Sequence, residues 1–471
     1  MSLTRHNAAR GAFVAAALAA AWIAPPAVSR LMHRCPVRPD GVDQAEALPS
    51  FARKYKMSCN QCHSGYPVLN AYGRQFKMNG FVRDRSGDEG VLKSQDGSLW
   101  TEAMTPWAVI VRSRPIDNGR GNMSSQGAQM GGTSAPNPNG FQMQPLNDVD
   151  AFIAGGDVAR HISYLGEVDA NQSNGFTPGM GDIRLGWHPV TWMNVIMARR
   201  NFFADDPYQT IASNESPTIS NRATDLLMQG QNSLSDNTML TMQQLIGVNG
   251  QVPLKGDSFL YYAAGASKDS DHGVQGSDPT NGNIRLALDN GNGIMIGTFG
   301  SYGSERTTNA GGLADSNLVS GIPAVGNGTE LVQFQRGGFD ALWEYNGFAA
   351  RGAFLYSHDY DSVYQLNDTN KAAYAELAYY YKRGNSSTPF LVPLVRENWL
   401  TTYNGTQQFN YVTAQLAHYF APNLKGFIEY SVDTKRDYQN SNVLYQPTLA
   451  ANGATLAPLG DRVSVQFEVG F

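Results

Sequence analysis

Charged side chains, cysteines and long apolar segments are all scarce in this chain of 471 residues. Charged residues make up 16% of it, against about 25% in ordinary soluble domains. The formal net charge of -5 leaves no basic surface of the kind that binds nucleic acid, which excludes that class of partner. After the amino terminus no segment approaches the roughly 18 uncharged apolar residues of a membrane-spanning helix, which excludes a helical membrane protein. The chain has 3 cysteines, and two of them stand at positions 59 and 62, so sulfur chemistry is confined to one place.

Glycine, polar uncharged residues and aromatics take the place of charge. The chain has 49 glycines and 11% aromatic residues. Low charge with many aromatics and glycines is typical of outer-membrane barrels. It also suits a surface that faces acid, where carboxylates are largely protonated. Composition alone leaves both interpretations open.

The amino terminus has the pattern of a secretory signal. Basic residues precede an apolar run over residues 11–24, which is too short to cross a bilayer as a helix. We expect a signal peptide over residues 1–29, cut after Ala27-Val28-Ser29, and a linker over residues 30–49. A second small-x-small motif, Ala45-Glu46-Ala47, lies farther from the apolar run and is the alternative cleavage site.

The carboxy terminus, residues 461–471, alternates between apolar and polar side chains. One face carries Val463, Val465, Phe467, Val469 and Phe471, and the other carries Ser464, Gln466, Glu468 and Gly470. A strand with one wholly apolar face that ends in phenylalanine is typical of the closing strand of bacterial outer-membrane barrels. An edge strand of a β-sandwich is the alternative.

Upstream segments indicate further hairpins. Residues 409–420 and 424–435 flank a turn at Ala421-Pro422-Asn423, and two more segments, Phe339 to Tyr345 and Phe348 to Tyr356, flank Asn346-Gly347. Short turns are expected near residues 159, 190, 254, 291, 346, 386 and 422. Long polar connections are expected at 115–147, 201–237, 303–328, 359–371 and 436–460. This alternation is the outer-membrane pattern, in which the short turns and both termini lie on the periplasmic side.

The fold class predicted from these patterns is mainly β. We expect an antiparallel porin-like barrel of about 16 strands over residues 99–471, from a strand at 104–114 to one at 461–471. A small α-helical domain over residues 50–98 precedes it.

The two paired cysteines belong to the pentapeptide Cys59-Asn-Gln-Cys62-His63. In a Cys-x-x-Cys-His motif two thiols attach the vinyl groups of a haem, and the adjacent histidine ligates its iron. We therefore predict one covalent haem c, attached through Cys59 and Cys62, with His63 as the proximal ligand. A disulfide between the cysteines, a zinc site that includes His63, and a chance occurrence are the alternatives.

Residues 67–78 are expected to form a short amphipathic helix that covers one haem face, with Pro67 in its first turn and Asn79-Gly80 at its end. Gly73 inside this helix costs about 1 kcal/mol relative to alanine, which suggests that a flat group packs against it. A tolerated surface glycine is an equal alternative.

Met78 is the candidate distal ligand of the haem iron, because a methionine there raises the reduction potential. Simple packing of Met78 against the haem or the wall is the usual alternative. Met57 lies too close to the attachment site, whereas Met104 or a barrel residue is another possible donor. No residue that contacts the substrate iron is identified from the sequence.

Other residues with ligating side chains are expected to have ordinary roles. Cys35 stands alone, and the acidic loop 269–272 and the Asn/Gly run 289–293 are interpreted as solvated loops rather than calcium sites. The remaining histidines are expected in the lumen or in loops: His161, His188, His272, His358 and His418.

Residues 51–81 resemble the haem segment of the fused cytochrome–porin family, the outer-membrane cytochromes of iron-oxidising bacteria. Beyond the haem motif, the resemblance is carried by Pro67, Leu69, Gly73, Arg74, Phe76, Lys77 and Gly80. Met78 departs from the leucine expected in that family. The order of one haem domain and one porin-sized barrel also agrees. The resemblance implies that extracellular Fe(II) is oxidised and that electrons pass to a periplasmic cytochrome c or small copper protein.

Physical arguments place the haem domain inside the barrel. A domain of about fifty residues buries little core, so it needs a further surface, which the lumen supplies. An apolar band about 25 Å tall is too long for efficient tunnelling to a haem below the membrane. We therefore expect a plugged barrel that contacts outer-membrane lipid. Outward electron transfer or metal reduction, and a diffusion porin with a structural haem or none, are the alternatives. A peroxidase is disfavoured because no distal His/Arg pair can be placed.

Overall fold

The computed structural model describes most of the barrel and the segment that carries the cysteine pair. The described residues are 49–81, 91–93, 100–102, 106–117, 142–158, 161–172, 175–211, 216–220, 222–228, 243–269, 281–306, 331–361, 366–405, 407–438 and 462–471. The predicted signal peptide, most of the predicted linker, Cys35, Met104 and His272 lie outside this part of the chain.

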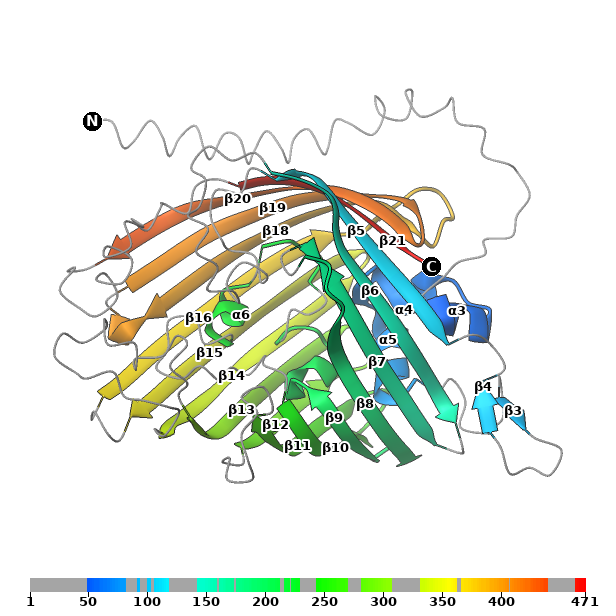
Figure 1. The fold of residues 1–471 in the computed structure, drawn as a ribbon, viewed down its shortest axis with the longest axis horizontal. Coiled ribbons are helices and arrows are strands. Elements are labelled where there is room, and N and C mark those ends of the chain that lie inside the picture. The colour runs from blue at the N-terminus through cyan, green and yellow to red at the C-terminus, as the bar shows by residue number, and fades with distance from the viewer. Residues whose placement is uncertain are drawn as a thin grey trace.

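The main body is a closed antiparallel barrel of sixteen strands, as predicted (Figure 1). Tyr380 interrupts one of these strands, which therefore carries the two labels β16 and β17. The barrel strands are β5 (Trp107–Asp117), β6 (Gln142–Val158), β7 (Ile162–Asn171), β8 (Gly179–Val190), β9 (Met193–Arg200), β10 (Gln243–Pro253), β11 (Phe259–Asp269), β12 (Asn281–Asp289), β13 (Ile294–Arg306), β14 (Leu331–Tyr345), β15 (Phe348–Asp361), β16 (Leu366–Tyr379), β17 (Tyr381–Lys382), β18 (Pro389–Thr402), β19 (Gln407–Ala421), β20 (Leu424–Tyr438) and β21 (Arg462–Gly470).

The last strand closes the barrel on the first. β21 pairs antiparallel with β5, from Ser464 opposite Asp117 to Gly470 opposite Ile110. Closure leaves no strand edge, so each strand finds backbone partners on both sides. The two hairpins predicted around residues 346 and 422 are the pairs β14–β15 and β19–β20.

The connections differ between the two ends of the barrel. All seven short turns predicted from the sequence join consecutive strands at one end, which we call the short-turn end. One predicted long connection, residues 359–371, is wrong. β15 continues to Asp361 and β16 begins at Leu366, so most of that stretch is strand.

The strands have polar inner and apolar outer faces. In β12, Asn283 and Arg285 are buried in the lumen, whereas Ile284 and Leu286, which alternate with them, point outward and are 49% and 38% exposed. The predicted alternation in β21 has the same sense, with Ser464, Gln466 and Glu468 buried inside. An apolar exterior around a closed antiparallel barrel is the architecture of outer-membrane proteins. No helix among the described residues is both long and apolar enough to span a bilayer.

Large exposed aromatic side chains surround the short-turn end. They flank its turns and the two chain ends of the barrel: Trp107, Trp187, Trp192, Trp343, Tyr345, Phe348, Tyr381, Phe420 and Phe471. Aromatic rings of this kind favour the boundary between lipid tails and water. The belt therefore indicates one margin of the apolar band.

Two segments occupy the barrel interior. The amino-terminal helices α3 (Pro49–Tyr55), α4 (Cys59–Cys62) and α5 (Ala71–Met78), with the small strands β1 (His63–Gly65) and β2 (Val68–Leu69), lie at the short-turn end (Figure 1). A second segment folds inward after β9. It comprises residues 201–211, 216–220 and 222–228, with the 3-10 turn η2 (Phe202–Asp205) and α6 (Ala223–Met228), and is called here the inward segment. β3 (Val91–Lys93) and β4 (Trp100–Glu102) belong to neither segment and pair with each other as a separate two-stranded sheet.

Candidate functional site

The helical turn α4 presents both cysteines of the Cys-x-x-Cys-His motif. Ser58 caps its amino terminus by accepting a hydrogen bond from the Asn60 backbone N–H at 3.4 Å. His63 ends it and donates its backbone N–H to the Cys59 carbonyl. Because the turn carries both thiols and the histidine follows directly, this donor set fits a covalently attached haem. No disulfide joins Cys59 and Cys62.

The His63 ring is oriented by a backbone carbonyl. Its Nδ1 lies 3.1 Å from the Pro67 carbonyl oxygen. Since a carbonyl only accepts, Nδ1 carries the proton in this bond, and Nε2 is the nitrogen that would ligate iron. This is the arrangement that fixes the tautomer of a metal-binding histidine. It therefore supports the predicted role of His63 as an axial ligand.

Both cysteines are shielded from solvent in the fold, Cys59 more fully than Cys62. Cys59 is 2% exposed and packs against Ala52 of α3. Burial also raises the pKa of the Cys62 thiol to about 11, so this thiol stays protonated at neutral pH. No group of three or more His, Cys, Asp or Glu side chains in the described ranges has an arrangement that would hold a metal ion.

Helix α5 begins later than predicted. The prediction started the helix at Pro67, but Asn70 is the cap, because its side chain accepts the Gly73 backbone N–H at 2.9 Å. Pro67 instead lies in the turn between β1 and β2. The helix ends where expected, with Asn79 as its cap.

Gly73 is required by a close approach. A Cβ on Gly73 would lie 2.0 Å from the Cys62 carbonyl oxygen, so only glycine lets α5 pack on α4. A neighbour does pack closely against Gly73, as expected, and it is the Cys62 peptide of the Cys-x-x-Cys-His motif. A tolerated surface glycine is therefore the wrong interpretation.

Met78, the predicted distal ligand, packs against the barrel wall. It is 4% exposed, and its cluster consists of Tyr208, Phe259, Tyr261, Ala263, Ala287, Met295 and Leu342. Cys59 belongs to a different cluster. Met57 accepts the Tyr72 hydroxyl at 3.8 Å. The packing alternative for Met78 is thus observed, and iron ligation by Met78 stays a prediction.

The other histidines are divided between the two faces. His161 lies in a turn and His188 is buried in the lumen, as expected, where Asn194 and Ser163 bind its ring. His358 and His418 lie on the outward face, contrary to the prediction of a lumen or loop position. Their neighbours in sequence are buried inward, and the strand alternation points these two rings away from the lumen.

Hydrogen bonds tie residues 49–81, called here the helical segment, to the inner wall of the barrel. The Tyr66 carbonyl accepts the Tyr419 hydroxyl at 2.9 Å and the Lys425 ammonium at 3.1 Å. Arg74 forms an ion pair of 2.7 Å with Glu344 of β14. On the opposite side, Asn194 of β9 donates to the Met78 carbonyl at 3.2 Å. The segment is therefore held from several directions.

Shape also fixes the end of α5 against the wall. Gly80 has φ +73, and a Cβ there would lie 2.3 Å from Nε2 of His188. Gly156 of β6 approaches equally closely, because a Cβ on it would lie 2.3 Å from the Phe81 carbonyl oxygen. Glycine on both sides lets the helical segment and the strands come into backbone contact.

The inward segment fills the lumen next to the helices. Ile219 and Ser220 donate their backbone N–H groups to Glu429 of β20 at 2.7 and 2.8 Å. The Tyr374 hydroxyl donates to the Thr210 carbonyl at 2.7 Å. Lys77 of α5 in turn donates to the carbonyl oxygen of Ala204 at 2.9 Å. The wall, the inward segment and the helices thus form one hydrogen-bonded assembly.

The pKa values of the two carboxyls at the end of η2, Asp205 and Asp206, are shifted in opposite directions. Burial alone would raise the pKa of Asp205, but Arg184, Arg200 and Lys77 outweigh that effect and hold it below its usual value. Burial raises the pKa of Asp206, and Arg285 offsets only part of that rise. The two adjacent carboxyls therefore differ in the pH at which they ionise.

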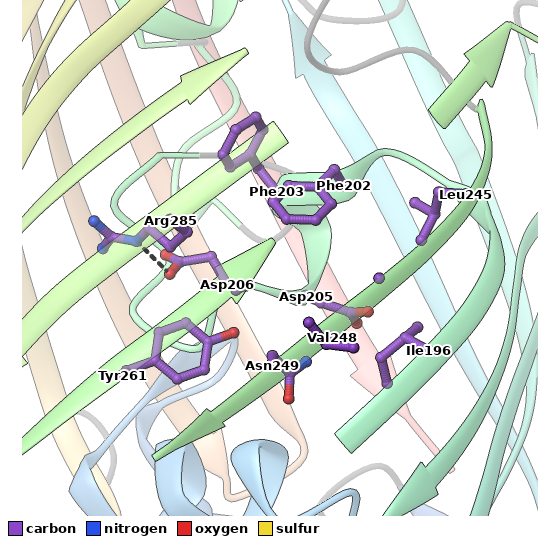
Figure 2. Close-up of a pocket in the computed structure, with 12 residues that line it drawn as sticks. Ile196, Phe202, Phe203, Asp205, Asp206, Leu245, Val248, Asn249, Tyr261 and Arg285 are labelled. Carbon is purple, nitrogen blue, oxygen red and sulfur yellow. Dashed lines mark hydrogen bonds and ion pairs between the residues drawn. The ribbon is translucent and has the colours of Figure 1, made fainter. Parts of the chain in front are cut away.

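A small cavity lies between η2 and the wall. Figure 2 shows Phe202, Phe203, Tyr261 and the ion pair of Asp206 with Arg285 around it. Its volume is about 20 Å³, which is room for about one water molecule. No passage for a solute follows from a space of that size.

The inward segment was not predicted from the sequence. Residues 201–237 were predicted to be a polar surface loop, whereas Phe203, Ile211 and Ala223 are buried in a core cluster with wall residues. The apolar residues in that stretch were the available indication, since a solvated loop would not bury them.

The likenesses to known proteins lie among solved structures. No protein-family model and no curated protein matches the chain. Among solved structures, OmpT of Vibrio cholerae in its trimer form aligns with a TM-score of 0.48 and 9% identity, over 78% of this chain and 98% of that chain. An anion-selective porin from Comamonas acidovorans aligns with a TM-score of 0.49 and 9% identity, over the same shares. Salmonella typhi OmpF in complex with daunomycin aligns with a TM-score of 0.46 and 13% identity, over 78% of this chain and 97% of that chain. These are likenesses of fold.

Proposed function

We propose that the protein is an outer-membrane electron conduit that oxidises extracellular Fe(II) and passes electrons to a periplasmic cytochrome c or small copper protein. The observation that carries the proposal is the hydrogen bond from His63 Nδ1 to the Pro67 carbonyl, directly beside two thiols on one helical turn. A disulfide motif has no need of an oriented histidine, and a structural zinc site would need a fourth ligand. Haem c, when bound, supplies a one-electron carrier.

Each part of the chain has a task in this proposal. Cys59 and Cys62 hold the group covalently, and His63 ligates its iron through Nε2. Tyr419 and Lys425 fix the following turn through the Tyr66 carbonyl. The helical segment and the inward segment together exclude bulk water from the lumen. Such a barrel would let an electron cross while the metal ion stays outside.

The orientation follows from the general plan of outer-membrane barrels. Short turns and both chain ends face the periplasm in such barrels. The Cys-x-x-Cys-His turn lies at the short-turn end, where Asn60 donates to Thr388 of the turn before β18 at 2.7 Å. A periplasmic carrier would therefore approach the side at which the motif lies.

The proposal is tested by anaerobic mixing of the purified protein with Fe(II). We expect the absorption bands of reduced haem to appear, and a variant with Cys59→Ser and Cys62→Ser to show none. Intact-mass measurement separates the two possible failures. If haem is attached but Fe(II) does not reduce it, the substrate is wrong. If no haem is attached, the conduit itself is wrong.

Outward electron transfer by the same conduit makes a different prediction. A measured high reduction potential favours oxidation of iron, whereas a low potential favours delivery of electrons to an external metal.

A diffusion porin is the second candidate, favoured by the sixteen strands and by the loop that folds into the lumen after β9. Conductance across a planar bilayer separates it from a conduit. A plugged barrel passes little ion current, and an open porin passes much.

A further inference from the structure

The Pro67 carbonyl that orients His63 accepts a second hydrogen bond, which comes from the inward segment of the barrel. Gln209 donates from Nε2 to the same oxygen at 3.3 Å, and its Oε1 accepts the Leu69 backbone N–H at 2.8 Å. One side-chain amide thus binds the two peptide groups that flank Val68, shortly after the Cys-x-x-Cys-His motif. His63 donates to this carbonyl at 3.1 Å. A carbonyl has two lone pairs, so it can serve both donors at once.

The position of Gln209 is fixed from several sides. It is 5% exposed, and Arg222 donates to its backbone carbonyl at 2.7 Å. The next residue, Thr210, donates its hydroxyl to Asp340 of β14 at 2.5 Å. Gln209 has φ +58, a conformation that side-chain-bearing residues seldom adopt. Such a residue persists only where its surroundings determine it, so the amide has little freedom to leave Pro67.

We propose that Gln209 is a positioning residue that raises the reduction potential of the haem by sharing the Pro67 carbonyl with His63. The inference rests on the proposed haem site. A second donor withdraws electron density from the carbonyl oxygen, which weakens that oxygen as an acceptor for His63. The imidazole then gives less electron density to the iron, and the ferric state is stabilised less. An electron acceptor for Fe(II) benefits from this shift.

The expected size follows from the usual effect of groups that hydrogen-bond to a metal-ligating histidine. Their removal typically changes metal affinity or activity by about 10-fold to 100-fold. We expect the lower limit, because Gln209 acts on the histidine through a shared acceptor. A tenfold change in the relative stability of the two oxidation states corresponds to about 59 mV for one electron. Loss of the Gln209 amide is therefore expected to lower the potential by about that amount.

The experiment is a potentiometric titration of the full-length, haem-loaded protein and three variants. Gln209→Met keeps the volume and removes the amide. Gln209→Gly also removes it and suits the positive φ, so the loop keeps its backbone if the methionine variant fails to fold. Gln415→Met is the matched control. Gln415 is likewise buried and donates to a proline carbonyl of the inward segment, Pro217, at 2.6 Å.

The outcomes are distinct. A lowered potential in both Gln209 variants, with an unchanged potential in Gln415→Met, supports the inference. An unchanged potential in the Gln209 variants with haem attached overturns it and leaves the conduit intact. An equal shift in all three variants also overturns it, because the effect would then be a general one of the lumen. Absence of haem in the unsubstituted protein defeats the proposed function itself.

Discussion

Removal of the Arg74 guanidinium should release the helical segment from the barrel. In Arg74→Met the ion pair of 2.7 Å to Glu344 and the hydrogen bond of 3.1 Å to the Leu69 carbonyl are both lost. The Arg74 side chain is 4% exposed and that of Glu344 is 18% exposed, so Glu344 keeps some contact with water. Breaking a buried pair costs roughly 3–5 kcal/mol, and the partial exposure of Glu344 favours the lower limit of about 3 kcal/mol.

This cost converts into a measurable change in ion flow. About 1.4 kcal/mol corresponds to a factor of ten, so about 3 kcal/mol makes the undocked state roughly 100-fold more frequent. Single-channel recording in a planar bilayer should show open events that are roughly 100-fold more frequent in Arg74→Met. The haem absorption spectrum should persist, because the covalent attachment does not depend on docking.

A matched control uses a second buried arginine. Arg336 pairs with Asp359 at 3.3 Å, and neither side chain is more than 1% exposed, but both lie on the wall strands β14 and β15. Arg336→Met should lower the thermal stability of the barrel without increasing open events. Equal conductance of Arg74→Met and the unsubstituted protein would refute the idea that this ion pair holds the plug.

Three further substitutions test other parts of the structure. Gly80→Ala should also increase conductance, because its Cβ would clash with His188, whereas Gly384→Ala has a similar positive φ of +59 but open space and should not. Asp205→Asn should be less stable to guanidinium than the unsubstituted protein at pH 5. Because the folded-state pKa of Asp205 is lowered, its contribution is fully present above the unfolded pKa of about 4 and is lost progressively as the pH falls from there through the folded pKa, so the two curves should converge only below the folded pKa. Phe339→Arg places a charge on an outward side chain that is 61% exposed, and it should cost about 2–4 kcal/mol in a bilayer if the site lies near its midplane, with no such loss for Phe339→Leu.

The barrel was predictable because its determinants are local. Alternation in β21 and the Asn346-Gly347 turn each specify a strand or hairpin within about ten residues of sequence. Lipid outside and a polar lumen inside force the same alternation on every strand, so an error in one strand boundary does not shift the others. The long connection predicted at residues 359–371 failed because polar side chains that face the lumen look like loop residues. Asp359 and Asn370, within that stretch, are fully buried inside the barrel.

Only the Cys-x-x-Cys-His turn of the candidate site could be located from the sequence. Cys59, Cys62 and His63 are adjacent in sequence, and their spacing carries the chemistry. The predicted start of α5 was wrong because the helix is capped at Asn70, whose side chain accepts the Gly73 N–H, and not begun at Pro67. Gln209 lies far along the chain from His63, and only the folded barrel brings its amide to the Pro67 carbonyl. No local pattern encodes such a pairing.

The 2% exposure of Cys59 has a consequence for the order of biogenesis. Its side chain packs against Ala52 of α3, and the helical segment is surrounded by strands that meet only when β21 reaches β5. A tetrapyrrole with a rigid ring could not be joined to that sulfur once the cylinder has shut. In the proposed conduit, haem attachment would therefore precede insertion, and a cell that lacks haem-attachment enzymes should export a polypeptide that later loading cannot rescue.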